Sequence, residues 1–431
     1  MLRTRKVTLA ITAVLALALI VPNQAFAALT LLSSLSLSGT AGSVAYDSAT
    51  GRVWIGADSA FGDANHPTAF LYAYNADGTR ATEITNAPRT VNLFADASAS
   101  QMIAVPVQTG SPTLYNSSTY AAVTTYTGPA NTVQSSTYNS VTRKLYSPLL
   151  IGNTMSVTDI ATGTHSTISL PTSVLGAANI DQVSNKIFMY ESSSGLPTSK
   201  LVVVDGAAGT ASTVSFGRTL NGMALAPAAG KVYLTCQPGS YFETYDIATG
   251  SVTETTLSGS GYGAMAYMPL IGKVILANYS SGTGRFYPYD VATGTIGAEL
   301  TAAAGLAPRG INQATNSIYF VNTTTNQLTE LDASTGTVTG TYATPFTPRS
   351  VTPLGNTGVL LVTSLSTKQS VMLNGGATAG TSGGGSTSGG GTTTPTTSTS
   401  VPASSWWSIA LLALAGLGAL AVRRRKVAAT A

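Results

Sequence analysis

Four arginines stand where the innermost strands of a repeated β unit are expected to begin, and they are the residues best suited to bind a ligand. They are Arg89, Arg218, Arg309 and Arg349. Four guanidinium groups around one channel would form a positive funnel for a carboxylate, a phosphate or an acidic glycan. The alternative is that each arginine spans neighbouring units and donates hydrogen bonds to backbone carbonyls.

A long insertion in the first unit holds the residues whose types could bind a metal ion together. Asp58, Asp63 and His66 offer carboxylate and imidazole ligands. Their spacing differs from that of an EF-hand loop, which places acids at alternate positions before a glutamate. A solvated loop is therefore favoured and no cofactor is expected, with calcium as an unsupported alternative. The other histidine, His165, is expected on an outer strand.

Motif and charge patterns argue against several function classes. The sequence contains no Gly-x-Ser-x-Gly elbow, His-Glu-x-x-His pair or Walker loop. Only 9% of the residues are charged, and seven of the 21 basic residues lie in the two terminal segments. Because the part between them is slightly acidic, nucleic-acid binding is not expected. Cys236 is the only cysteine, so no intrachain disulfide can form, and a buried thiol on a strand is expected.

The elements that would position these residues follow a repeated hexapeptide, seen in Tyr-Asp-Ile-Ala-Thr-Gly at 245–250. An aspartate can accept backbone N–H bonds and start a turn, and a glycine lets the chain reverse between two strands. We interpret these aspartates as structural turn residues. They are Asp159, Asp205, Asp246, Asp290 and Asp332, spaced 41 to 46 residues apart. Such a period in β-type segments predicts propeller blades.

The count of repeats predicts an all-β propeller of eight four-stranded blades. Eight inner-strand openings occur between Ser43 and Arg349, and the last unit lacks its outer strand. The isolated strand pattern 31–38 is expected to supply that strand, which would close the ring and remove a free sheet edge. Seven blades is the alternative, if the diverged unit 88–130 merges with a neighbour.

The chain divides into four parts. Residues 1–27 have the charged start, apolar run and small-residue cleavage site of a secretory signal peptide, with cleavage between Ala27 and Ala28. Residues 28–374 form the predicted propeller. Residues 375–400 are a flexible linker rich in Gly, Ser and Thr. Residues 401–431 combine two tryptophans, an apolar run and an Arg cluster, which predicts a transmembrane helix with a cytoplasmic basic end.

Residues 308–338 resemble the YVTN-type β-propeller repeat. They contain Pro-Arg-Gly-Ile, Ser-Ile-Tyr-Phe-Val-Asn and Leu-Asp-Ala-Ser-Thr-Gly-Thr-Val. The resemblance covers about 43–374 and implies a propeller of the kind found in bacterial and archaeal cell-surface proteins. Relatives of similar shape include lactonases and quinoprotein-like enzymes, whose catalytic motifs are not matched here.

The tail resembles the PEP-CTERM and IPTL-CTERM sorting signals, in which a Pro-containing motif precedes a short helix and an Arg cluster. Ala403 stands where PEP tails have Glu, and Ser404 where IPTL tails have Leu. The resemblance implies processing by an exosortase-type protease; a permanent anchor is the alternative. An uncleaved N-terminal anchor is likewise the alternative to the signal peptide.

Two functions are compatible with these patterns. The first is an exported, membrane-anchored cell-surface propeller that binds a glycan, a matrix component or a surface protein without catalysis. The second is an exported propeller enzyme, either a lactonase-like hydrolase or a quinoprotein-like oxidoreductase. The low charge and the two histidines favour the first.

Overall fold

A computed structural model describes most of the chain between Leu29 and Gly375. The described ranges are 29–58, 69–87, 90–106, 111–127, 136–149, 152–193, 196–236, 241–257, 261–278, 285–300, 307–355, 357–364 and 367–375. Asp63, His66 and Arg89 lie outside these residues. So do the predicted signal peptide with its predicted cleavage site, the predicted linker beyond Gly375 and the C-terminal tail. Neither short helix in the described ranges has the length or hydropathy to cross a bilayer.

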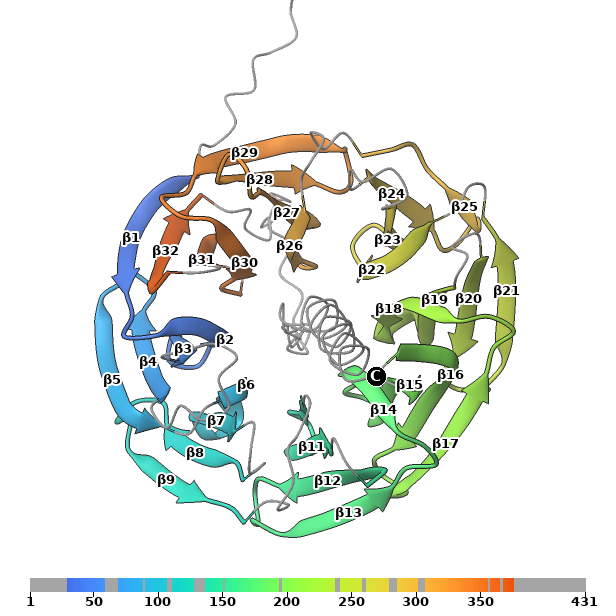
Figure 1. Ribbon diagram of the computed structural model, residues 1–431, viewed down its shortest axis with the longest axis horizontal. Helices are drawn as coiled ribbons and strands as arrows, with labels where there is room; N and C mark the ends of the chain where they lie inside the picture. The colour runs from blue at the N-terminus through green and yellow to red at the C-terminus, as the bar shows by residue number, and fades with distance from the viewer. Residues whose placement is uncertain are drawn as a thin grey trace, which may run out of the picture.

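Eight four-stranded antiparallel sheets surround a central channel (Figure 1). Blade 1 is β2 (Thr40–Asp47), β3 (Arg52–Asp58), β4 (Ala69–Asn75) and β5 (Arg80–Ala87). Blade 2 is β6 (Thr90–Asp96), β7 (Gln101–Pro106), β8 (Thr113–Asn116) and β9 (Ala122–Thr125). Blade 3 is β10 (Thr137–Asn139), β11 (Lys144–Pro148), β12 (Thr154–Asp159) and β13 (His165–Ser169). Blade 4 is β14 (Val174–Asp181), β15 (Lys186–Ser193), β16 (Leu196–Asp205) and β17 (Thr210–Ser215).

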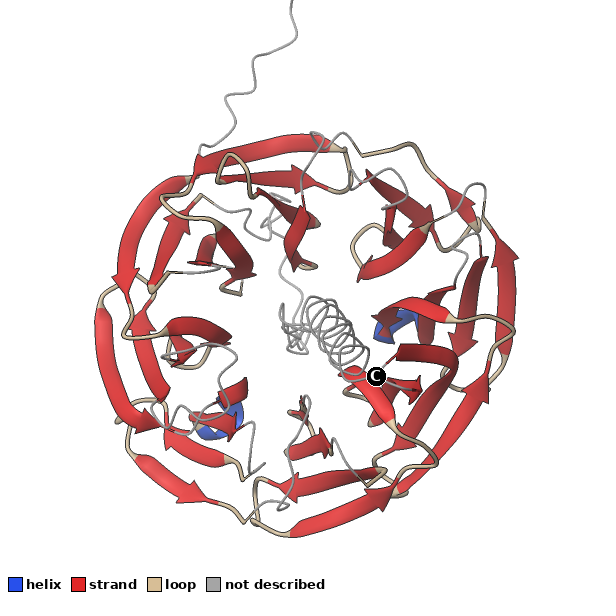
Figure 2. Ribbon diagram, in the orientation of Figure 1, coloured by secondary structure: helices blue, strands red, loops and turns tan. Residues whose placement is uncertain are grey.

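The second half of the ring repeats this order. Blade 5 is β18 (Leu220–Ala226), β19 (Lys231–Cys236), β20 (Tyr241–Asp246) and β21 (Val252–Thr256). Blade 6 is β22 (Tyr262–Met268), β23 (Lys273–Asn278), β24 (Arg285–Asp290) and β25 (Thr295–Ile296). Blade 7 is β26 (Ala307–Asn312), β27 (Ser317–Asn322), β28 (Gln327–Asp332) and β29 (Thr337–Ala343). Two short 3-10 helices, η1 (Ala97–Ala99) and η2 (Pro227–Ala229), lie between the first and second strands of blades 2 and 5 (Figure 2).

Blade 8 joins the two ends of the propeller. Its strands are β30 (Pro348–Pro353), β31 (Val359–Ser364), β32 (Gln369–Asn374) and β1 (Thr30–Ser36). β1 pairs antiparallel with β32 and brings Leu35 opposite Ser370. The predicted closure by an N-terminal strand is therefore confirmed. The eight-bladed prediction is confirmed over the seven-bladed one, because the diverged unit forms the complete blade 2.

The antiparallel strands define two faces of the ring. The turn face carries the turns that join the first strand to the second and the third to the fourth, such as 140–143 and 247–251. The loop face carries the connections from second to third strands and from each blade to the next. Inner strands therefore begin at the loop face and end at the turn face.

The repeated hexapeptide builds the outer turns of the turn face. In blade 5 the Oδ1 of Asp246 accepts the N–H groups of Ala248 and Thr249, and Gly250 turns the chain at a φ of 73°. The N–H of Gly250 then donates to the carbonyl of Asp246. Asp159, Asp205 and Asp290 each accept the amides two and three residues later in their own turns. Asp332 accepts the amide and the hydroxyl of Ser334.

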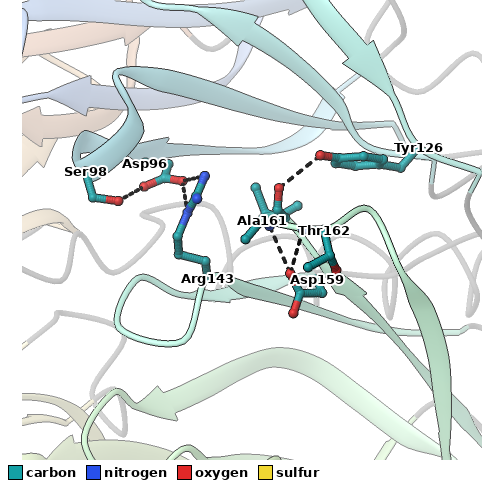
Figure 3. Close-up of polar contacts among 8 residues, drawn as sticks. Asp96, Ser98, Tyr126, Arg143, Asp159, Ala161 and Thr162 are labelled. Atoms are coloured by element: carbon teal, nitrogen blue, oxygen red, sulfur yellow. Dashed lines mark hydrogen bonds and ion pairs between the residues drawn. The ribbon is translucent and has the colours of Figure 1, made fainter.

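Apolar side chains fill the space between neighbouring blades. Between blades 4 and 5, Phe188 and Leu201 of one blade pack with Leu234 and Cys236 of the next, all fully buried. Polar contacts join the blades near the turn face. Arg143 of blade 3 forms an ion pair with the buried Asp96 of blade 2, its Nη2 lying 2.7 Å from Oδ2 (Figure 3).

Candidate functional site

Arg218 and its partners form the most developed polar group at the loop face. Arg218 lies in the connection between β17 and β18, and its side chain is 32% exposed. Its guanidinium carbon sits 3.1 Å from the ring centroid of Tyr241, and its Nε lies 3.4 Å from Oε2 of Glu254. Both partners belong to the outer half of blade 5, on β20 and β21. The guanidinium therefore extends along its own blade toward the outer strands.

A second carboxyl group lies directly across from Glu254. Glu243 of β20 pairs with Glu254 of β21 in register, and Glu243 is only 3% exposed. Burial raises the pKa of Glu243, the nearby charge of Glu254 raises it further, and Arg218 opposes the rise. Like charges directly opposite each other destabilise a sheet. The cation and the raised pKa both relieve that repulsion, so Arg218, Glu243 and Glu254 act as one electrostatic unit.

Cys236 lies beside this unit and is not a nucleophile. It is fully buried at the end of β19, as expected for a thiol on a strand. Burial, followed by the charges of Glu243 and Glu254, raises its pKa to about 12. Since the thiolate is the reactive form, this thiol is inert near neutral pH.

Arg309 and Arg349 occupy a different structural position, a bulge in the inner strand. The register of β26 shifts between Pro308 and Gly310, and that of β30 shifts between Pro348 and Ser350. Each arginine is the extra residue. Arg218 instead lies three residues before Asn221, the bulge residue of its own blade. The expectation of one shared position therefore fits Arg309 and Arg349 and does not fit Arg218.

The contact made by Arg349 corresponds to the interblade alternative. Its Nη1 donates to the carbonyl of Ala41 in blade 1 at 3.3 Å, and burial lowers its pKa. This bond links the inner strands of the first and last blades. In blade 7, a Cβ at Gly310 would lie 2.2 Å from the carbonyl oxygen of Val351, so glycine permits the close approach of β26 and β30.

The inner-strand bulge recurs around the channel in seven blades. The extra residues are Gly42, Val91, 176–178, Asn221, Met265, Arg309 and Arg349. A bulge re-aims the strand and strengthens its twist. Sequence inspection misses this feature, because the bulge positions share no residue type.

Of the three metal candidates, only Asp58 lies in the part of the chain that the structure covers. Asp58 ends β3, and Asp63 and His66 are outside the described ranges. Within those ranges no three His, Cys, Asp or Glu side chains gather into a metal-binding group. His165 begins β13, the outer strand of blade 3, and is exposed.

The carboxylates of the turn face serve the fold. Figure 3 shows Asp159 accepting the amides of Ala161 and Thr162. In the same view, Asp96 accepts the hydroxyl of Ser98 as well as the guanidinium of Arg143. These carboxylate oxygens already accept hydrogen bonds from amides, a hydroxyl or a guanidinium of the protein. They therefore order the turns and are not available to bind a ligand.

A small pocket also lies between blades 4 and 5 at the turn face. Its volume is about 240 Å³, and Lys186, Asp205, Thr210, Ser212 and Tyr245 contribute to its walls. The Nζ of Lys186 spans the two blades and donates to the carbonyl of Ile247 at 2.8 Å. This volume is below the roughly 300–1,000 Å³ typical of sites for drug-sized ligands.

Comparisons with known proteins identify the fold and no family. No protein-family model and no curated protein matches the chain. Among solved structures, the Dos1 propeller is similar, with a TM-score of 0.58 and 11% identity over 82% of this chain and 96% of that one. The C-terminal WD40 domain of Sif2 is similar, with a TM-score of 0.61 and 12% identity over 80% of this chain and 98% of that one. The chain is thus a β-propeller similar in fold to WD40 domains.

Proposed function

We propose that the chain is an exported β-propeller, anchored in a membrane by residues 401–431, that binds a partner at its loop face without catalysis. The partner is an acidic glycan or an acidic segment of a surface protein. The signal-type sequence at 1–27 and the Trp-apolar-Arg order of the tail support export and anchoring. The YVTN-type pattern at 308–338 supports a cell-surface role.

The observation that carries the binding role is the stack of Arg218 on Tyr241 at the loop face. Arginine and tyrosine are enriched among the residues that contribute most to protein recognition. The ring of Tyr241 orients the guanidinium, so little side-chain entropy remains to be lost on binding. Among the described residues, the guanidinium contacts one carboxylate, that of Glu254 at 3.4 Å through Nε, so its other nitrogens are donors for an anionic partner.

In the described part of the chain, the paired carboxyl groups that favour the enzyme alternative are Glu243 and Glu254. The raised pKa of Glu243, next to the carboxylate of Glu254, would suit acid–base chemistry. However, Glu243 is 3% exposed and covered by neighbouring strands. A substrate from solution cannot reach it in this structure, so the pair favours a structural role.

The test is an array of acidic and neutral glycans probed with the full-length protein in detergent. We expect the wild type to retain acidic glycans, and Arg218→Ala to weaken that retention about tenfold, which corresponds to about 1.4 kcal/mol. Arg80→Ala is the matched control, because it removes an equally basic, ion-paired side chain from the opposite face. Equal retention by wild type and Arg218→Ala would show that Arg218 is not the binding residue.

A further inference from the structure

The exposed large hydrophobic side chains of the described residues lie at the turn face, whereas most connections of the loop face lie outside the described ranges. In the described part of the chain, seven large hydrophobic side chains are exposed. They are Leu31, Leu32, Val123, Val141, Val183, Val252 and Leu270. The strand register places every one of them at the turn face, either in a turn or at the turn-face end of an outer strand.

Three of the seven occupy the same place in the inner turns of blades 3, 4 and 6. Val141, Val183 and Leu270 are 67%, 89% and 64% exposed, and each lies two residues after the residue that ends an inner strand. A lysine follows each of them by three residues, at Lys144, Lys186 and Lys273. Aliphatic side chains this exposed do not contribute to the packing between blades, so they are available to contact another surface.

The other four lie on the outer strands of blades 2, 5 and 8. Val123 and Val252 lie where β9 and β21 leave the outer turns. Leu31 and Leu32 lie near the start of β1, next to the end of β32. The seven residues therefore extend over six blades of one face and do not form one compact patch.

Both ends of the propeller leave from this same face. Thr30 pairs with Asn374, and the Oγ1 of Thr30 lies 3.4 Å from the carbonyl oxygen of Asn374. Since β32 runs toward the turn face, as β12, β16 and β20 do, residues after Asn374 start there. The linker of 375–400 has a typical reach of roughly 25–30 Å before the apolar tail begins.

We propose that the turn face lies against the lipid bilayer that holds the C-terminal tail, with these seven aliphatic side chains at the membrane interface. The proposal rests on the membrane anchor of the proposed function and adds the orientation of the ring. The loop face, with Arg218 and Tyr241, then faces away from the membrane toward a partner.

A bilayer fits this surface better than a protein partner does. Protein hot spots concentrate Trp, Tyr and Arg near the centre of one patch. Here the side chains are Val and Leu, and they are spread around a ring. The tether raises the local concentration of the face at the bilayer, so a modest apolar contact suffices.

The attraction should depend little on charge. The lysines of the turn face stand opposite turn aspartates in the strand register, as in Lys144 opposite Asp159 and Lys186 opposite Asp205. The same pairing occurs between Lys231 and Asp246 and between Lys273 and Asp290. The paired charges offset each other, so the contact with neutral lipid should persist at high salt.

The experiment places an environment-sensitive fluorophore on the full-length protein in phosphatidylcholine vesicles. Val183→Cys and Leu270→Cys report on the turn face. Thr324→Cys is the matched control, because it is exposed in the loop-face turn between β27 and β28. The wild type, whose Cys236 is fully buried, serves as the labelling blank. We expect brominated lipids to quench labels 183 and 270 at least severalfold more than label 324, at low and high salt alike.

Each other outcome identifies a different failure. Equal quenching at 183 and 324, or stronger quenching at 324, overturns the orientation. A blue shift at 183 that needs no lipid and rises with protein concentration assigns the face to a second copy and also overturns it. Carbonate washing of the vesicles distinguishes loss of the orientation from loss of the membrane anchor. Protein that stays on the vesicles without quenching at 183 keeps the anchor and loses the orientation, whereas protein that washes off loses both.

Discussion

At the scale of single residues, Gly206 of blade 4 leaves room for a tyrosine side chain from blade 3. It follows the turn aspartate of blade 4, where four other blades have Ile160, Ile247, Val291 and Ala333. The hydroxyl of Tyr146 in blade 3 occupies the space of the missing side chain. That hydroxyl accepts a hydrogen bond from Nδ2 of Asn185 at 2.8 Å. The glycine that makes this copy of the hexapeptide imperfect therefore allows a close contact between blades 3 and 4.

We expect Gly206→Ala to destabilise the ring. The new Cβ would lie 2.5 Å from the Tyr146 hydroxyl and 2.7 Å from Nδ2 of Asn185, so the contact must open. The expected loss is about 1–3 kcal/mol of unfolding free energy, which exceeds the roughly 0.4–1 kcal/mol gained by restricting the unfolded chain. Urea denaturation of the detergent-solubilised chain measures it. Gly217→Ala is the control, since nothing lies within 4 Å of a Cβ there, and equal midpoints would contradict the expectation.

Residue patterns in the sequence predicted the turns and singled out Arg218, but they did not predict the partners of Arg218. The turn hydrogen bonds connect residues two or three apart, so a local motif reports them. Arg218 meets Glu254 36 residues later, across two strands, and this pairing depends on register. The arginines share a preceding proline or glycine in the sequence, but they lie at different positions relative to the inner-strand bulge. The bulge positions share no residue type, so the sequence does not reveal this difference.

At the scale of elements, β1 holds the ring closed through one apolar row. Leu35 is 3% exposed and packs in a cluster with Val53 and Tyr72 of blade 1 and Met372 of β32. Leu31, on the same strand, is 50% exposed. β1 therefore contributes to two blades at once, through pairing with β32 and through packing against blade 1.

We expect Leu35→Ala to lower the unfolding free energy by about 2–5 kcal/mol, because it leaves a cavity at the closure. Leu31→Ala on the same strand should change it by under about 0.5 kcal/mol, because its side chain is exposed. Denaturant midpoints of the two variants measure the difference. A similar midpoint for both would mean that packing by β1 does not stabilise the ring.

Strand positions followed well from sequence, because each blade must bury apolar side chains on both faces of a short sheet. The orphan strand at the N-terminus was recognisable because the last unit lacked a fourth strand. The short β25 of blade 6 was not predicted. Pro288 on the neighbouring β24 has no N–H to donate to an outer strand, so pairing there is limited to two residues and an isolated bridge farther along.

At the scale of the whole molecule, two turn aspartates, Asp246 and Asp290, give the ring a dependence on pH. The amide of Thr249, followed by its hydroxyl, lowers the pKa of Asp246, and the amide of Thr293 lowers that of Asp290. A lowered pKa in the folded state stabilises the fold above the ordinary value near 3.8, and this stability is lost as pH falls through the lower value. The ring should therefore lose stability on acidification below about pH 4.

Asp246→Asn should keep the turn and flatten this acid dependence. Blade 2 supplies the precedent, since the Oδ1 of Asn116 accepts the amides of Ser118 and Thr119 in the equivalent turn. Thermal unfolding between neutral pH and pH 3 measures the effect. We expect a similar midpoint at neutral pH and a smaller fall in acid. A variant that falls as steeply as the wild type would show that Asp246 does not contribute to the pH dependence.

The closing pair also determines the order in which the molecule can be completed. Thr30 and Asn374, the partners at one end of that pair, are 344 residues apart in the chain. As the protein is synthesised from its N-terminus, β1 emerges first and its partner strand last. β1 therefore has no partner strand until β32 is made, after the sequences of the other seven blades. A chain interrupted shortly before Gln369 would therefore leave β1 without its partner strand, so closure of the ring requires nearly the whole propeller sequence.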